Sequence, residues 1–189
     1  MRNLIVIVHI SLDGFVAGND GGFNNFIGDE ENLQFVCSVT DDADAALLGK
    51  VSYELLNGSW PTAGSSPDAT AGVKKYAAWY NAVPKYVLST SLRTTNEKNT
   101  ILIGENIPEQ INKIKQQAGK NILLFGSPTA TRSLLGLGLI DGFCILLHPV
   151  IFGKGIPLFE DTDAVTRLSL QSTKQLRSGI VVMQYLIRT

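Results

Sequence analysis

Three short stretches of small polar residues follow apolar segments and could bind an anion. They are Gly49-Lys50, Ser89-Thr90-Ser91 and Gly126-Ser127. The first and third lead directly into helical patterns, where free backbone N–H groups and the helix dipole favour negative charge. A glycine also lets a phosphate approach the backbone closely, because it has no side chain. Together the stretches predict a phosphate or pyrophosphate site.

The third stretch also has a simpler interpretation. Gly126 can serve only to allow a tight turn between a strand and a helix. Ser127 is then an ordinary N-cap, and Pro128 suits the first helical turn because it has no N–H to leave unpaired. Strand ends of the same kind at three places in one chain favour the ligand over the turn alone.

Two glycine-containing stretches imitate nucleotide-binding motifs without meeting their requirements. GLGLIDG at 136–142 follows a helical pattern instead of a strand, so its glycines are expected to end that helix. GKVS at 49–52 resembles the end of a P-loop, but the earlier loop glycine is absent. Neither stretch is taken as a binding motif.

The stretch SLDGFVAG at 11–18 leads from an apolar strand into a loop, 11–28, that is rich in glycine and asparagine. A loop of this length in a compact domain is often an active-site lid. The alternative is a surface loop that turns at Asp13-Gly14. If the loop is a lid, Asp13 is the side chain that we favour for a catalytic role.

The elements that must position these residues alternate between strand and helix. Apolar runs bounded by turn residues predict strands at 4–10, 45–48, 85–88, 100–103, 122–125 and 143–148, and two β segments near 167–176 and 180–188. Helical spacing predicts helices at 29–39, 51–56, 73–80, 107–118 and 129–137, the fourth capped by Asn106 and ended by Gly119. Residues 57–67 read as a surface loop. This order predicts one α/β domain over 1–189, with a mainly parallel central sheet, helices on both faces and a C-terminal antiparallel hairpin.

Composition limits the classes of function. The 189 residues carry a net charge of −1 with scattered lysine and arginine, which argues against nucleic acid or an anionic membrane as a partner. Cys37 and Cys144 fall in apolar patterns and are expected to be small buried side chains; neither belongs to a metal-ligand cluster, and no metal is expected. The apolar run at 4–10 is too short to span a membrane and lacks a cleavage site, so we expect a cytoplasmic chain.

Five motifs in register carry a family resemblance. SLDGFVAG, LLGKVSYE, KYVLSTSL, ILLFGSPTATRSLLGLGLID and LHPVIFGKGIPLF occur in that order along most of the chain. Together they resemble the family of the riboflavin-pathway pyrimidine reductase domain, the RibD C-terminal domain, which shares the dihydrofolate reductase fold. The resemblance implies a three-layer dihydrofolate reductase-like domain that acts as an NADPH-dependent reductase.

The same resemblance assigns the cofactor-binding residues. Gly49, Lys50, Val51 and Ser52 would face the pyrophosphate or adenosine, and Ser89, Thr90 and Ser91 would take the 2′-phosphate and adenine ribose. Gly126, Ser127, Pro128, Thr129 and Ala130 would wrap the pyrophosphate and nicotinamide ribose, and Ala17 in the lid would touch the nicotinamide end. Lys50 stands where the family usually has arginine, and Ser127 stands where a second glycine is common.

On the substrate side the resemblance implies a small heterocycle, most closely 5-amino-6-(5-phosphoribosylamino)uracil. The predicted pocket residues are His9, Ser11, Leu33, Val36 and His148, with 148–159 as the rim of the cleft. The chain has no His-x-Glu with Pro-Cys-x-x-Cys, so a role in riboflavin synthesis needs a separate deaminase.

Three alternatives stay open. One is a dihydrofolate or pterin reductase, although Leu33 and Val36 face inward where a pterin would need an acid. The second is a reductase of an unrelated small molecule, and the third, from another class, is an NADP-binding protein without turnover.

The C-terminal segments also predict a homodimer. They are rich in apolar residues and are expected at a sheet edge, and no helical pattern follows residue 160 to cover them. A long apolar edge favours aggregation unless something covers it, and a second copy related by a two-fold axis could do so. Related reductases commonly pair. The alternative is a monomer in which the hairpin folds against the chain's own helices.

Overall fold

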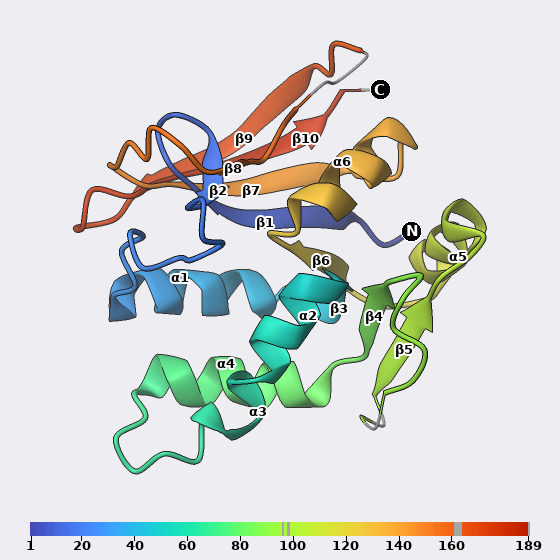
Figure 1. Ribbon diagram of the computed structural model, residues 1–189, viewed down its shortest axis with the longest axis horizontal. Helices are drawn as coiled ribbons and strands as arrows, with labels where there is room; N and C mark the ends of the chain where they lie inside the picture. The colour runs from blue at the N-terminus through green and yellow to red at the C-terminus, as the bar shows by residue number, and fades with distance from the viewer. Residues whose placement is uncertain (96, 98, 161–163, 189) are drawn as a thin grey trace.

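A single mixed sheet organises the chain. The computed structural model describes residues 1–95, 97, 99–160 and 164–188, and within them eight strands follow the order β5-β4-β3-β6-β1-β7-β10-β9 (Figure 1). The parallel strands are β1 (Leu4–Ile10), β3 (Ala43–Gly49), β4 (Lys85–Leu88), β5 (Thr100–Ile103), β6 (Asn121–Phe125) and β7 (Gly142–Leu147). The antiparallel hairpin is β9 (Leu168–Gln175) and β10 (Val181–Ile187), with β10 paired to β7. The predicted sheet architecture is confirmed.

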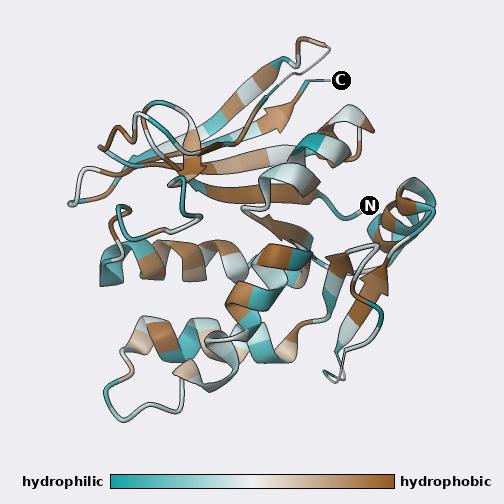
Figure 2. Cartoon of the chain, in the orientation of Figure 1, coloured by the Kyte–Doolittle hydropathy of each residue, from teal (hydrophilic) through white to brown (hydrophobic). Residues whose placement is uncertain are grey.

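Helices cover both faces of this sheet. They are α1 (Glu30–Thr40), α2 (Lys50–Asn57), α3 (Trp60–Ala63), α4 (Ala71–Ala82), α5 (Ile107–Gln116) and α6 (Pro128–Gly136). The side chains of Val6 and Val8 in β1 join one core with α5 and α6, whereas Ile7 joins a second core with α1 and α4. Because successive residues of a strand point to opposite faces, a strand buried on both sides reads as the continuous apolar run seen at 4–10. The inner strands are accordingly the most apolar part of the chain (Figure 2).

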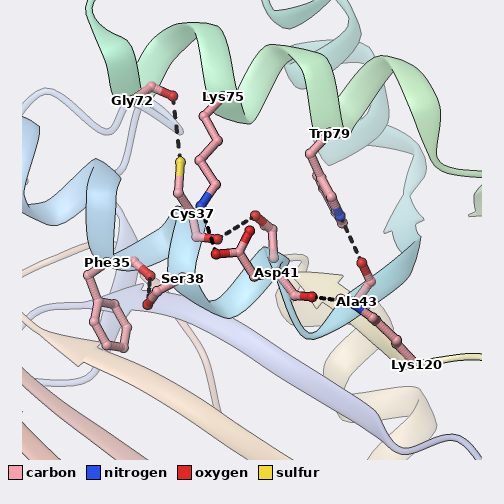
Figure 3. Close-up of polar contacts among 10 residues, drawn as sticks. Phe35, Cys37, Ser38, Asp41, Ala43, Gly72, Lys75, Trp79 and Lys120 are labelled. Carbon is pink, nitrogen blue, oxygen red and sulfur yellow. Dashed lines mark hydrogen bonds and ion pairs between the residues drawn. The ribbon is translucent and has the colours of Figure 1, made fainter.

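Polar contacts fasten α4 to α1 and to the start of β3 (Figure 3). Trp79 Nε1 donates to the carbonyl of Ala43 at 2.9 Å, and Lys75 Nζ lies 2.7 Å from the Asp41 carboxylate. The Cys37 thiol donates to the carbonyl of Gly72. Cys37 is only 2 % exposed, so it is the small buried side chain that its pattern predicted, and Cys144 is equally buried.

Two short elements, β2 (Phe15–Ala17) and α3, lie where the sequence predicted loops. Strand β2 lies inside the 11–28 loop and pairs with β8 (Ile156–Pro157), and α3 lies inside 57–67. The expectation of a continuous loop in both segments is therefore wrong. A strand of two or three residues has no measurable periodicity of its own, and its pairing depends on a partner far away in the chain.

Two of the predicted helix caps do not work as expected. Asn106 and Ser127 occupy the N-cap positions of α5 and α6, but neither side chain bonds to the helix. An N-cap side chain reaches the first turn from an extended backbone. Asp29 and Thr70, which do cap α1 and α4, have that backbone, whereas φ is 49° at Asn106 and 26° at Ser127. Helix α5 also ends at Gln116, before Gly119.

Strand β9 is an edge of the sheet, as predicted, but it is not the apolar edge that the sequence suggested. Residues 170–175 of this strand are all exposed, and Leu170 is the only apolar residue among these six. The apolar residues of the hairpin lie mostly on β10, which is paired on both sides. The edge itself therefore presents polar side chains to solvent.

Candidate functional site

The carboxyl ends of five neighbouring parallel strands bring the predicted site residues to one edge of the sheet. From β4 to β3, β6, β1 and β7, these ends carry Ser89, Gly49, Gly126, Ser11 and His148 in that order. In open α/β sheets, ligands bind outside the carboxyl ends of the strands. The three predicted phosphate-binding turns are therefore neighbours, and the predicted substrate residues on β1 and after β7 lie beside them. The sequence predicted His148 as the last residue of this strand, but β7 ends at Leu147 and His148 follows it directly.

The turns after β3 and β6 touch. A Cβ added at Gly49 would lie 2.1 Å from Ser127 Oγ, so only glycine fits there without a shift of that hydroxyl. Gly126 has a φ of +56°, and Ser127 follows it with a φ of 26°. A Cβ at Gly126 would meet nothing within 4 Å, so the space over this turn is open. A non-glycine residue at positive φ stores strain, and such strain often accompanies a binding site.

Helices α2 and α6 begin at these turns without side-chain caps. Lys50, Val51 and Ser52 form the first turn of α2, and Pro128, Thr129 and Ala130 form that of α6. Helices α1 and α4, by contrast, are both capped by side chains. Uncapped N–H groups at a helix start are available to an anion.

Ser89 shapes the turn after β4. Its Oγ accepts hydrogen bonds from the amides of Leu92 at 2.8 Å and of Ser91 at 3.2 Å. Thr90 and Ser91 are exposed. The Ser89 hydroxyl thus holds the turn, and the Ser91 hydroxyl lies 3.5 Å from it.

Asp13 fastens the start of the lid to the segment after β7. Its carboxylate accepts from the Ser11 hydroxyl at 2.7 Å and from the amides of Phe152 at 3.1 Å and Gly153 at 2.7 Å. The Ser11 hydroxyl lowers the pKa of Asp13, and the two amides lower it further. Ala17 is buried in β2, against β8. The first part of the predicted lid is therefore attached to the segment after β7 at two places, through the Asp13 carboxylate and through the pairing of β2 with β8.

His9 and His148 form a hydrogen-bonded pair. His9 Nδ1 lies 2.8 Å from His148 Nε2, and His148 Nδ1 accepts from the amide of Ile27 at 3.1 Å. His148 is fully buried and His9 is partly exposed. The pKa of each falls from 6.5 to about 4, and burial is the main cause for both; the His148 ring adds to the fall at His9, whereas the Asp29 carboxylate opposes it at His148. Both rings are neutral at pH 7.

Two phenylalanines enclose the histidine pair. The ring of Phe26 lies 4.6 Å from that of His148, and the ring of Phe152 lies 4.9 Å from that of Phe26. Phe152 is the residue whose amide Asp13 holds. The aromatic cluster thus connects the lid, the end of β1 and the segment after β7.

Of the predicted pocket residues, Leu33 and Val36 are not brought to this pair. Both pack into the core between the sheet and α1. The structure instead adds Asn32, which is 5 % exposed and donates from Nδ2 to the carbonyl of Ile27 at 2.7 Å. Asn32 lies four residues before Val36, on the same inward face of α1, and this spacing could have indicated it.

An open groove lies at the opposite edge of the sheet. It has a volume of about 830 Å³, and its lining includes Asn3, Gly138, Asp141 and Arg188. None of the predicted site residues is among them. We place the site at the carboxyl edge, because the uncapped helix starts, the strained turn and the neutral histidine pair all lie there.

Two further classes of site are absent from the described residues. No group of three or more His, Cys, Asp or Glu side chains could hold a metal ion. No helix in that part of the chain is long and apolar enough to cross a membrane.

Comparisons with known proteins identify the family and the fold. The family model of the RibD C-terminal domain matches residues 2–182. A Bacillus subtilis (strain 168) protein, named "Uncharacterized protein YyaP", is 33 % identical over 186 residues, which cover 97 % of this chain and 94 % of the relative.

Two solved structures share the fold. Dihydrofolate reductase from Enterococcus faecalis, complexed with NADP(H) and RAB-propyl, superposes with a TM-score of 0.65 at 13 % identity, covering 99 % of this chain and 97 % of that one. A diaminohydroxyphosphoribosylaminopyrimidine deaminase/5-amino-6-(5-phosphoribosylamino)uracil reductase from Thermotoga maritima gives a TM-score of 0.67 at 13 % identity, covering 99 % of this chain and 57 % of that one. The fold is that of dihydrofolate reductase.

Proposed function

Because the chain belongs to the RibD C-terminal domain family, we propose that it is an NADPH-dependent reductase of a small heterocycle, of the 5-amino-6-(5-phosphoribosylamino)uracil type. The observation that carries the proposal is the turn at Gly126-Ser127. This turn packs against Gly49, has open space above it and starts an uncapped helix. Those are the properties that a pyrophosphate needs of a backbone.

The residues present fit the cofactor. The amide groups at the starts of α2 and α6 would hold the pyrophosphate, and Lys50 adds a positive charge at the start of α2. The exposed hydroxyls of Thr90 and Ser91 would bind the 2′-phosphate, and Ala17 would lie at the nicotinamide end. NADPH, when bound, supplies the hydride. The chain's own residues bind and orient both ligands and exclude water beneath the lid.

The substrate would lie on the side of β1 and β7, where His9 and His148 meet the aromatic cluster. The Thermotoga maritima enzyme, whose name includes a uracil reductase, shares this fold and supports a pyrimidine-type substrate. The likeness to dihydrofolate reductase makes a pterin the second candidate. We rank it second because the buried residues of α1 are Asn32, Val36, Cys37 and Thr40, and none of them is a carboxylate.

Cofactor titration tests the proposal. We expect NADPH to bind roughly tenfold or more tightly than NADH, because Thr90 and Ser91 offer hydroxyls to a phosphate and no acidic residue immediately follows them to hold a free ribose. The measurement is the fluorescence of the bound reduced nicotinamide. Equal dissociation constants would contradict the assignment of this turn.

Two matched glycine variants test the pyrophosphate turn. Gly126→Val and Gly138→Val both place a branched side chain at positive φ in open space, at +56° and +66°. Both should lose similar stability, but only Gly126→Val should lose NADPH binding, since Gly138 lies at the opposite edge of the sheet. If folded Gly126→Val protein binds NADPH normally, the turn has no role in binding. NADPH oxidation with a panel of pyrimidines and pterins then separates an enzyme from an NADP-binding protein without turnover.

A further inference from the structure

The hydrogen bonds around His148 fix the position of every proton in the histidine pair. The amide of Ile27 can only donate, so His148 Nδ1 is the unprotonated nitrogen. In a neutral ring the proton is then on Nε2, which donates to His9 Nδ1. His9 must therefore carry its own proton on Nε2. All the N–H groups in this chain of hydrogen bonds therefore point the same way, from Ile27 through His148 to His9.

The chain of hydrogen bonds ends in a free donor. Within the described residues, His9 Nε2 has no hydrogen-bond partner, and it is not among the buried unpaired atoms, so it is open to solvent or ligand. At the other end, a backbone amide does not give up its proton near neutral pH. The pair therefore cannot pass protons from solvent to a substrate, and it acts as an oriented N–H donor.

Asn32 presents the complementary group on the other side of Ile27. Its Nδ2 donates to the carbonyl of Ile27, and this contact identifies the remaining atom as Oδ1. Asn32 Oδ1 is buried and has no partner among the described residues. A buried acceptor without a partner destabilises the protein, and a bound N–H group would satisfy it. Ile27 thus connects the free donor, His9 Nε2, to the free acceptor, Asn32 Oδ1: its amide bonds to His148 and its carbonyl to Asn32.

We propose that His9 and Asn32 recognise the substrate, with His9 Nε2–H donating to a carbonyl oxygen and Asn32 Oδ1 accepting from a ring N–H of a neutral cyclic amide. His148 is a positioning residue that sets the tautomer of His9. This inference rests on the proposed reductase function and adds the residues that select its substrate. It also follows that the histidine pair does not supply the proton needed after hydride transfer.

The tautomers can be measured without substrate. Two-dimensional ¹⁵N NMR of histidine-labelled protein at neutral pH should show unprotonated Nδ1 and protonated Nε2 in both rings. In His148→Leu, the His9 signal should become a mixture of tautomers. A wild-type His9 that carries its proton on Nδ1 would overturn the proposal, whatever the protein binds.

Binding of two probes tests recognition. 5,6-Diaminouracil has two carbonyl groups and ring N–H groups, whereas 2,4,5,6-tetraaminopyrimidine has amino groups in place of both oxygens. With NADP⁺ bound, wild-type protein should prefer the uracil by about tenfold or more. His9→Leu should remove most of this preference, and His9→Gln, which keeps an N–H donor, should restore part of it. Asn32→Leu should weaken binding of the uracil, and thermal unfolding checks that each variant is folded.

The outcomes separate the two proposals. A wild-type protein that binds NADP⁺ but shows no preference between the probes contradicts the role of His9 and leaves the reductase function standing. The same holds if His9→Leu keeps the full preference. A protein that does not bind NADP(H) contradicts the reductase function, and the NMR result then decides the histidine arrangement alone.

Discussion

Acid should destabilise this protein through His9 and His148. Both rings are neutral in the folded state because burial lowers the pKa of each to about 4, whereas an unfolded histidine titrates near 6.5. Between these values the unfolded chain binds protons that the folded chain does not bind. The stability from the neutral pair is thus fully present above pH 6.5 and is lost as the pH falls toward 4.

The magnitude follows from the same shift. A fall in pKa from 6.5 to about 4 corresponds to about 3 kcal/mol of unfolding free energy for one group. His148 is fully buried and should contribute most of that amount, while solvent screens the partly exposed His9. The two rings also titrate as a coupled pair. We therefore expect a total loss of about 3–5 kcal/mol between pH 7 and about pH 4.5.

The assay is urea denaturation at several pH values, on wild-type protein and on the double variant His9→Gln/His148→Gln. Carboxylates such as Asp29, which faces His148, titrate in both proteins, so the difference between the two curves isolates the histidines. The unfolding free energy of the wild type should fall more steeply with acid than that of the variant. If the unfolding free energies of the two proteins fall in parallel with pH, the histidine pair does not stay neutral in the folded state and the reasoning is refuted.

Three further outcomes are expected. Ser127→Gly should raise the unfolding free energy by about 1 kcal/mol, because it relieves the strain of positive φ; a less stable variant in urea denaturation would contradict this. Lys115→Met should lower the unfolding free energy by about 3 kcal/mol, because Lys115 Nζ is buried 2.7 Å from the Asp141 carboxylate. The control Lys75→Met removes an exposed ion pair of the same length and should lower it by less than about 1 kcal/mol. Equal losses would show that burial does not set the contribution of these ion pairs. The predicted homodimer should give twice the chain mass of 20.4 kDa in light scattering, and a mass near 20.4 kDa that does not change on concentration would contradict it.

Elements with strong local patterns could be predicted from the sequence. The strands 4–10, 85–88 and 100–103 have the predicted bounds, because each is an apolar run with turn residues at its ends. The predicted phosphate-binding turns also adjoin one another, since parallel neighbours place their carboxyl ends at one edge. In these cases the information lies within a few consecutive residues.

Features that depend on distant residues could not be predicted. His9 and His148 are separated by 139 positions, and neither has a local signal for the other. The role of Asn32 depends on which of its atoms Ile27 engages, and that is decided by tertiary packing. Ser127 has a favourable N-cap residue type, but its backbone conformation, set by the turn against Gly49, prevents capping.

The position of β1 has a consequence for how the chain folds as it is synthesised. The two neighbours of this central strand are β6 and β7, and the register pairs Leu4 with Ile122 and Ile5 with Gly142. The apolar sequence LIVIVHI therefore leaves the ribosome with neither partner made, while only β3, β4 and β5 can pair among themselves. Contacts this distant in sequence form slowly, and an unpaired apolar strand is prone to aggregation. Chaperones that bind short apolar segments should hold the nascent chain until residues near 147 have emerged.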